Sequence, residues 1–250
     1  MSIVHFIGAG PGAPDLITLR GKELIQQADV IIYAGSLVNP ALLDYAKPGA
    51  EIHNSAVMTL DEVIGVMEQA NRENRDIARL HTGDPSIYGA IREQIDRLNA
   101  LGIAWDVCPG VSSFCAAAAA LGAEYTLPGV SQTVIISRAE GRTPVPEKEK
   151  LSALASHGAT MVLFLSAGML DKVSQELIRG GYSPETPAAI VYKASWPDER
   201  IFRGTVGALS SMGDVEKTAL VIVGNILGDE YELSRLYSPD FATGFREARQ

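Results

Sequence analysis

IVHFIGAGPG, residues 3–12, joins an apolar run directly to a glycine-rich turn. The β-branched and aromatic residues at 3–7 favour a β-strand, the turn starts at Gly8, and helical spacing follows over residues 18–28. A second apolar run at residues 29–33 predicts another strand after that helix. A strand, a tight turn, a helix and a strand in this order are typical of an α/β fold.

The same alternation continues to the end of the chain. Further strands are predicted at residues 76–80, 103–107, 133–137, 161–165, 188–193 and 220–223. Further helices are predicted over residues 90–101, 116–120, 147–156 and 170–179, and another begins at the capping-box spacing of residues 59–62. Gly102 is expected to end the helix before it.

Small residues and prolines punctuate the middle of the chain at residues 122–131. They predict an N-terminal α/β domain of residues 1–122 and a C-terminal α/β domain of residues 123–250. In the C-terminal domain, Trp196-Pro197-Asp198 separates the apolar run at residues 188–193 from Arg200-Ile201-Phe202-Arg203 in the manner of a hairpin. A hairpin requires antiparallel strands, so the sheet of this domain is predicted to be mixed.

Composition limits the classes of function. The 250 residues are 46% hydrophobic and 20% charged, as in ordinary globular proteins, and the formal charge of −9 argues against a nucleic-acid binder. No apolar run reaches about 18 residues, so no membrane-spanning helix and no membrane partner are expected. The start of the chain lacks a secretion signal, and the two cysteines, Cys108 and Cys115, favour a reducing compartment, so a cytoplasmic location is expected. The four histidines lack metal-ligand spacing, so no metal site is predicted.

The glycine loop admits two simple interpretations. Gly8, Gly10 and Ala13 fit a loose dinucleotide fingerprint, which would indicate NAD. That fold also needs an acidic residue at the end of the second strand, where this chain has Tyr33-Ala34-Gly35, and Pro11 removes a backbone donor. The other interpretation is a tight strand-to-helix turn without any ligand.

Two further loops of small residues follow predicted strands. Residues 82–89 contain Asp84, whose carboxylate could accept hydrogen bonds from ribose hydroxyls or an ammonium group, or could simply cap a turn. Residues 109–113 open the next helix, where Ser112 or Ser113 could be an N-cap. Because ligands of open α/β sheets collect at the carboxyl ends of strands, the three loops together predict one shared crevice.

These motifs, in this order, resemble the tetrapyrrole methyltransferase family. The resemblance is carried by GAGPG at residues 8–12, ADVIIY at 28–33, GDPSIYG at 83–89 and PGVSS at 109–113, and the second half resembles the family's C-terminal domain. It implies two α/β domains in a tetrapyrrole-methylase-type fold, with the cofactor crevice between them. It also implies transfer of a methyl group from S-adenosyl-L-methionine, with S-adenosyl-L-homocysteine as product, to a small-molecule tetrapyrrole, by a homodimer.

Within this family the chain resembles the branch that methylates C11 of precorrin-4, giving precorrin-5, in cobalamin biosynthesis. The segments concerned are YAGSLVNP at residues 33–40, HTGDPSIYGAI at 81–91 and TLPGVSQT at 126–133. The uroporphyrinogen-III branch has an acidic residue where this chain has Ala34, which counts against that branch. Three alternatives stay open: a cobalt-loaded substrate, another position on the corrin, and a carrier without catalytic activity.

The resemblance also implies site residues. The positions that match cofactor contacts are Pro11, Thr82, Gly83, Asp84, Ile87, Ser112, Ser113, Leu165, Ala194 and Thr218. For Leu165, Ala194 and Thr218 the alternative is that they are ordinary core residues at strand ends.

The substrate carries many carboxylates, which arginine can bind in a bidentate manner, so Arg138 and Arg142 are the candidate substrate-binding residues. Their alternative role is that of solvated surface residues. A catalytic base is not assigned, because Tyr88, Glu124 and the substrate's own carboxylates are all candidates.

Overall fold

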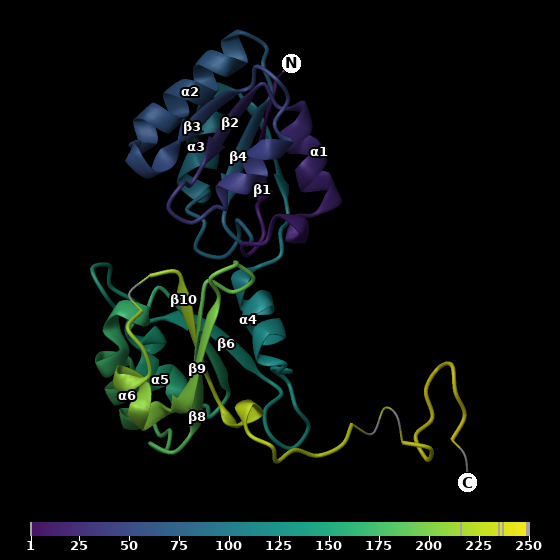
Figure 1. The fold of residues 1–250 in the computed structure, drawn as a ribbon, viewed down its shortest axis with the longest axis vertical. Coiled ribbons are helices and arrows are strands. Elements are labelled where there is room, and N and C mark those ends of the chain that lie inside the picture. Colours follow the sequence, from purple (N-terminus) through teal and green to yellow (C-terminus); the bar gives the residue numbers. More distant parts are fainter. Residues whose placement is uncertain (1, 216, 235, 237, 249–250) are drawn as a thin grey trace. The chain divides into compact units, whose positions relative to one another are not determined.

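The computed structural model describes residues 2–215, 217–234, 236 and 238–248 (Figure 1). Its contacts divide the chain into two compact units. The first unit is Met1–Ala117 with Lys193–Glu199, and the second unit is Ala118–Tyr192 with Arg200–Gln250. The chain first passes from one unit to the other within helix α4 (Ser113–Leu121). The division into domains of residues 1–122 and 123–250 stays a prediction.

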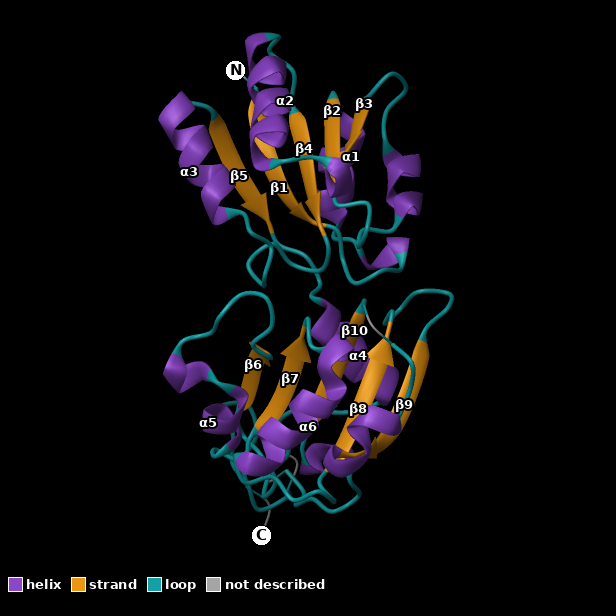
Figure 2. Cartoon of the chain, turned by 90° about the vertical axis from the view of Figure 1, so that its left-hand side faces the viewer, coloured by secondary structure: helices purple, strands orange, loops and turns teal. Residues whose placement is uncertain are grey.

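The first unit contains a five-stranded sheet in the order β3-β2-β4-β1-β5 (Figure 2). All four strand pairings are parallel. The strands are β1 (Ile3–Gly8), β2 (Val30–Tyr33), β3 (Glu51–Asn54), β4 (Ile77–His81) and β5 (Ala104–Cys108). The helices are α1 (Leu19–Gln27), α2 (Leu60–Arg72), α3 (Arg92–Leu101) and the 3-10 turns Pro14–Leu16, Pro40–Tyr45 and Ser55–Val57.

Alternate residues of the strands bury opposite faces of this sheet. Val4, Phe6 and Ile32 pack in one cluster with side chains of α2 and α3, whereas Ile7 and Ile31 pack in another with α1 and the turn Pro40–Tyr45. Because strand side chains alternate between faces, apolar residues at successive positions mean that both faces are covered by helices.

The strand order creates a topological switch between β1 and β4. From β1 the chain crosses to β2 through α1, and from β4 it crosses to β5 on the other side through α3. The loops after β1 and β4 therefore leave the sheet in opposite directions. Ligands of open α/β sheets bind at such a point, outside the carboxyl ends of the strands.

The second unit contains a mixed five-stranded sheet in the order β6-β7-β10-β8-β9. Only the β6–β7 pair is parallel among its described pairings, and β8 and β9 form the predicted antiparallel pair. The strands are β6 (Val134–Arg138), β7 (Thr160–Phe164), β8 (Pro187–Tyr192), β9 (Arg200–Thr205) and β10 (Ala219–Val223). The helices are α5 (Leu151–Ala155), α6 (Leu170–Arg179) and the 3-10 turns Glu147–Glu149, Ala167–Met169, Val206–Ser211 and Asn225–Leu227.

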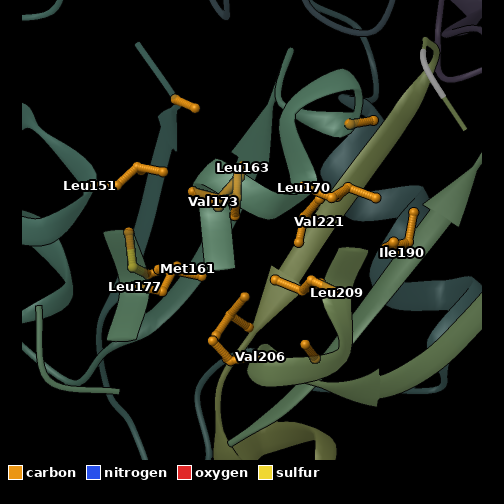
Figure 3. Close-up of a cluster of buried hydrophobic side chains, with 14 of the residues drawn as sticks. Leu151, Met161, Leu163, Leu170, Val173, Leu177, Ile190, Val206, Leu209 and Val221 are labelled. Carbon is orange, nitrogen blue, oxygen red and sulfur yellow. The ribbon is translucent and has the colours of Figure 1, made fainter. Parts of the chain in front are cut away.

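The core of the second unit lies between this sheet and the helical segments on one face. Figure 3 shows Met161, Leu163 and Val221 of the sheet facing Val173 and Leu177 of α6. All five side chains are fully buried. At about 25 cal/mol per Å2 of apolar surface removed from water, such a cluster contributes much of the free energy of unfolding.

The predicted α/β class, the mixed second sheet and most element positions are confirmed. The capping box is present: Glu62 N donates to Thr59 Oγ1, and Thr59 N donates to Glu62 at 2.7 Å. Gly102 ends α3 with a left-handed φ of 67°.

Two local predictions were wrong or incomplete. The helix expected over residues 147–156 is interrupted at Lys150, which is extended (ψ 144°) between a 3-10 turn and α5. Strand β3 was not predicted, because its residues Glu51–Asn54 form a polar edge strand without an apolar run. No helix in the described ranges is long and apolar enough to cross a membrane.

Candidate functional site

The loops after β1 and β4 are joined by backbone hydrogen bonds at the switch point. Gly83 N donates to the Gly10 carbonyl at 2.7 Å, and Gly10 N donates to the Gly83 carbonyl at 3.3 Å. Ala9 N donates to the His81 carbonyl at 2.8 Å. These bonds extend the β1–β4 pairing beyond the sheet, so the two predicted loops form one structure.

The third predicted loop approaches the other two so closely that only glycine fits. A Cβ on Gly8 would lie 2.4 Å from the backbone of Gly110 and 2.8 Å from the Gly83 carbonyl. A Cβ on Gly110 would lie 2.3 Å from the same carbonyl. These glycines are therefore required by contact between the loops.

Asp84 links the second loop to the third. Its Oδ1 accepts hydrogen bonds from the backbone N–H, at 2.9 Å, and the hydroxyl of Ser86, and its Oδ2 accepts from Gly110 N at 2.8 Å. Burial alone would raise the pKa of Asp84, but the bonds from Ser86 and Gly110 outweigh it, so this pKa lies below its usual value. The turn-capping role is thus present, and Oδ2, which accepts from Gly110 N, retains capacity for a second donor.

The remaining predicted residues of these loops lie beside Asp84. A Cβ on Gly83 would be 3.3 Å from Ser113 N and 3.4 Å from Ser112 Cα, so the β4 loop rests on the start of α4. Ile87 N donates to the Asp84 carbonyl at 3.2 Å and closes the turn. The structure brings Gly83, Asp84, Ile87, Ser112 and Ser113 together, and Thr82 immediately precedes them.

A segment from the far end of the chain covers the first loop. Trp196 Nε1 donates to the Pro11 carbonyl at 3.1 Å. The indole ring packs on Gly12 so closely that a Cβ added to Gly12 would lie 2.0 Å from Trp196 Cδ1. Ala13 N donates to Ser195 Oγ at 3.0 Å. This contact places Ala194, the residue before Ser195, beside the Pro11 loop.

Strand directions place the other predicted residues on one edge of the second sheet. The carboxyl ends of β6, β7 and β8 share that edge with the amino ends of β9 and β10. Arg138 ends β6, Leu165 follows β7 and Thr218 precedes β10. Arg138 donates to the carbonyls of Thr143 and Pro144 at 3.1 and 2.8 Å, so it holds its own loop, whereas Arg142 in that loop is exposed.

Backbone strain is concentrated in these strand-end segments. Among the described residues, the non-glycine residues with positive φ are Asn74, Tyr88, Ala90, Leu165, Lys193, Ser195 and Thr218. All but Asn74 and Ala90 lie next to predicted site residues or are themselves predicted. Leu165 is also 66% exposed, which is unusual for a large apolar side chain. Strain of this kind clusters at functional sites. Leu165 is exposed and Thr218 is half-buried, so neither is an ordinary core residue, and their role as site residues stays a prediction.

A cavity of about 280 Å3 opens beside the β4 loop in the first unit. Its walls include Thr82, Ile87 and Tyr88 of that loop. It is also lined by Arg79 and His81, which are only 7% and 5% exposed. Both belong to β4, where their neighbours are apolar.

The sequence prediction missed several residues of this region. Trp196 and Ser195 carry no local signal, because nothing short-range reveals that residue 196 lies on residue 12. Arg79 follows an ordinary strand pattern, although a charged residue inside an apolar run could have indicated a special role. No group of three His, Cys, Asp or Glu side chains in the described parts of the chain is placed to hold a metal ion.

Comparison with known proteins identifies the class to which this architecture belongs. The family model of Tetrapyrrole (Corrin/Porphyrin) Methylases matches residues 4–210. The chain belongs to this family. The fold prediction and the resemblance are therefore confirmed.

Individual relatives cover almost the whole chain. The chain is 56% identical over 251 residues to a Methanocaldococcus jannaschii protein named cobalt-precorrin-4 C(11)-methyltransferase, covering 99% of this chain and 97% of that protein. It is 47% identical over 248 residues to a Sinorhizobium protein named precorrin-4 C(11)-methyltransferase, covering 97% and 98%.

Solved structures agree in fold. The X-ray structure of a cobalamin biosynthetic enzyme, cobalt precorrin-4 methyltransferase, matches with a TM-score of 0.88 at 50% identity, covering 91% of this chain and 96% of that one. A uroporphyrin-III C-methyltransferase from Thermus thermophilus, complexed with S-adenosyl homocysteine, matches with a TM-score of 0.76 at 27% identity, covering 91% and 94%.

Proposed function

We propose that this protein transfers a methyl group from S-adenosyl-L-methionine to C11 of precorrin-4 or its cobalt-loaded form, in cobalamin biosynthesis. The observation that carries the proposal is full-length similarity, at 56% identity, to a protein named for that reaction. The loops that match the family's cofactor motifs are intact and are tied together at the switch point.

The described residues fit this cofactor. Its ribose hydroxyls and its ammonium group need acceptors, and Asp84 Oδ2 retains capacity for one more donor. The exposed apolar side chain of Leu165 and the strained backbone at Thr218 are the features expected of residues that contact an adenosine group. We propose that Pro11, Thr82, Gly83, Asp84, Ile87, Ser112, Ser113, Leu165, Ala194 and Thr218 bind the cofactor.

The contribution of the protein to the reaction is positioning. When bound, S-adenosylmethionine supplies a methyl group that its sulfonium sulfur already activates. The loop network fixes Asp84 through Ser86 and Gly110, so the carboxylate is oriented before any ligand arrives. Preorganised positioning can lower a barrier by about 7–11 kcal/mol. Arg142, exposed on its loop, is the candidate for binding a substrate carboxylate, and Arg138 supports that loop.

The first test is calorimetric titration with S-adenosylhomocysteine in parallel with NAD. The proposal expects saturable binding of S-adenosylhomocysteine and none of NAD, because β2 ends at Tyr33 without an acidic residue. Binding of NAD alone would reject it. A methyl-transfer assay with precorrin-4, followed by mass and NMR analysis of the product, then separates an enzyme from a carrier that binds without turnover.

The metal state of the substrate needs its own assay. Relatives named for the cobalt-loaded and the metal-free substrate are 56% and 47% identical to this chain, so both forms are candidates. Comparing kcat/KM for the two substrates decides between them. A ratio within about threefold, less than 1 kcal/mol, would mean that the chain does not discriminate.

We also propose that the enzyme is a homodimer and that it acts in the cytoplasm. The family resemblance supports the dimer. Sedimentation velocity at micromolar concentration should give twice the mass of 26.6 kDa. A species at the monomer mass would reject this part of the proposal.

A further inference from the structure

The cavity beside the β4 loop contains a buried cation without a buried counterion. Arg79 lines it and is buried, and the described part of the chain offers Arg79 no ion pair. Glu93 also lines this cavity, but its side chain is exposed. A guanidinium in such a position is expensive to bury unless a negative group joins it. We call this cavity the Arg79 pocket.

The guanidinium is held rigidly by neutral acceptors. Nε donates to Gln94 Oε1 at 3.1 Å, and Nη1 donates to Ser55 Oγ at 3.0 Å and to the Ile32 carbonyl at 3.4 Å. Nη2 makes no hydrogen bond to a described residue, and it is not fully buried. The arginine is therefore fixed in place with one nitrogen left for a ligand.

His81, which lines the same pocket, has a ring nitrogen without a hydrogen-bond partner among the described residues. This atom, Nε2, is fully buried. Burial foremost, and then the charge of Arg79, lower the pKa of His81 to about 3, against a weaker opposing effect of the Gly89 backbone. A neutral imidazole beside a cation does not compensate its charge. Native structures usually satisfy such an atom with a protein group, an ordered water or an ion.

One half of the residues that line the pocket are apolar. They include Ala34, Leu37, Met58, Leu60 and Val63. The volume of about 280 Å3 accommodates a short acid, because a water-sized group takes about 30 Å3. An apolar group that carries a carboxylate on a short side chain matches this combination of apolar wall residues and the buried Arg79 cation.

We infer that the Arg79 pocket receives one peripheral carboxylate of the tetrapyrrole, with Arg79 Nη2 as its cationic partner and His81 lining the same pocket. The inference rests on the proposed function. The pocket borders Thr82 and Ile87, so a substrate anchored in it lies next to the loop assigned to the cofactor.

The test compares Arg79→Gln, Arg79→Lys and a control, Arg92→Gln. Arg92 is an exposed residue of α3 that pairs with Asp96 and does not line the pocket. We expect Arg79→Gln to raise KM for the tetrapyrrole about 10- to 100-fold, since a hydrogen bond to a charged group is lost. Arg79→Lys should raise it less, because it keeps the charge, and Arg92→Gln should not change it.

Two further measurements identify the source of the carboxylate. The cofactor also carries one, so the Kd of S-adenosylhomocysteine is measured for each variant and should stay at the wild-type value. In 15N NMR, titration of the wild type with propionate should shift the His81 imidazole signal, and Arg79→Gln should abolish that shift. Circular dichroism of both Arg79 variants checks that they fold.

Each outcome has one meaning. A weaker Kd for S-adenosylhomocysteine in Arg79→Gln assigns the pocket to the cofactor and overturns the inference. An unchanged KM in both Arg79 variants also overturns it. If the wild type transfers no methyl group to either tetrapyrrole but propionate still shifts His81, the proposed function fails and the carboxylate site remains.

Discussion

The two sheets of this molecule differ in the residues that form the loops at their strand ends. In the first unit all strands are parallel, and the loops at their carboxyl ends are packed against one another through Gly8, Gly83 and Gly110. In the second unit the sheet is mixed, and its corresponding edge carries Leu165 and Thr218, non-glycine residues held at positive φ. At these positions the first edge uses glycine so that backbones can touch, whereas the second keeps side chains at positive φ, as the first unit also does at Tyr88 and Ala90.

The difference indicates what each edge provides to a ligand. Where glycines pack on glycines, the ligand meets backbone groups and the one carboxylate, Asp84, that they orient. Where side chains are retained in a left-handed conformation, the side chain itself is needed, since glycine would be the less strained choice. Replacing Gly8 by a larger residue should therefore lower the free energy of unfolding, whereas replacing Thr218 by glycine should raise it.

The largest effect is expected from Gly8→Ala. Its new Cβ would lie 2.4 Å from backbone atoms that cannot rotate away, so the free energy of unfolding should fall by about 3 kcal/mol or more. Urea unfolding followed by circular dichroism measures this. Gly65→Ala is the control, because nothing lies within 4 Å of that α2 position, and it should stabilise the protein by about 0.5–1 kcal/mol. Equal effects of the two substitutions would contradict the loop-contact explanation.

The next largest effect is expected from Asp84→Asn. The amide group cannot accept from both Ser86 and Gly110, so the free energy of unfolding at pH 7 should fall by about 1.5–3 kcal/mol, with weaker S-adenosylhomocysteine binding.

The same substitution predicts a pH dependence. Because the folded pKa of Asp84 is lowered, its stabilisation is present above the unfolded value of 3.8 and is lost as the pH falls through the lower folded value. The difference in unfolding free energy between wild type and Asp84→Asn should shrink below pH 3.8. A difference that is constant with pH would show that the charge is not the cause.

An effect of opposite sign is expected from Thr218→Gly in the second unit. Removing a β-branched residue at φ 57° should raise the free energy of unfolding by about 1 kcal/mol. It should also weaken S-adenosylhomocysteine binding, since the side chain is lost. Asn74→Gly relieves a similar φ of 56° far from the predicted residues and should leave binding unchanged. Unchanged binding in both variants would remove Thr218 from the site.

The smallest effect is expected from Trp196→Phe. Phenylalanine keeps most of the packing on Gly12 but cannot donate to the Pro11 carbonyl, which should cost about 0.5–1.5 kcal/mol in S-adenosylhomocysteine binding. Calorimetry measures it, with Trp105→Phe as the control because Trp105 donates to Asn99 on α3 instead. An identical change in both variants would point to general destabilisation.

Most of the fold could be predicted because its signals are local. The α6 helix was predicted at its observed bounds, since four buried residues recur at helical spacing in it, and the strands of both cores follow apolar runs. The edge strand β3 could not be predicted in this way, because none of its residues is fully buried and it has no apolar run. Its polar residues Glu51 and His53 pair with each other instead.

The site could be predicted only in part, for the same physical reason. The three loops were found because their small residues follow strands, but the role of Gly8 in contacting Gly110 depends on a separation of about a hundred residues. Trp196 on Gly12 and the buried Arg79 depend on tertiary structure alone. The residues transferred by family resemblance stay predictions, although the strain at Leu165 and Thr218 supports them.

Lys193–Glu199 completes the first unit, and this has a consequence for protein synthesis. At about 5–20 residues per second, the ribosome needs roughly 4–15 s to continue from residue 117 to residue 193. Through that interval the nascent first unit has every strand of its sheet but lacks the indole that covers Gly12. The last step in forming the Pro11 loop must therefore follow translation of Lys193–Glu199, the segment between β8 and β9.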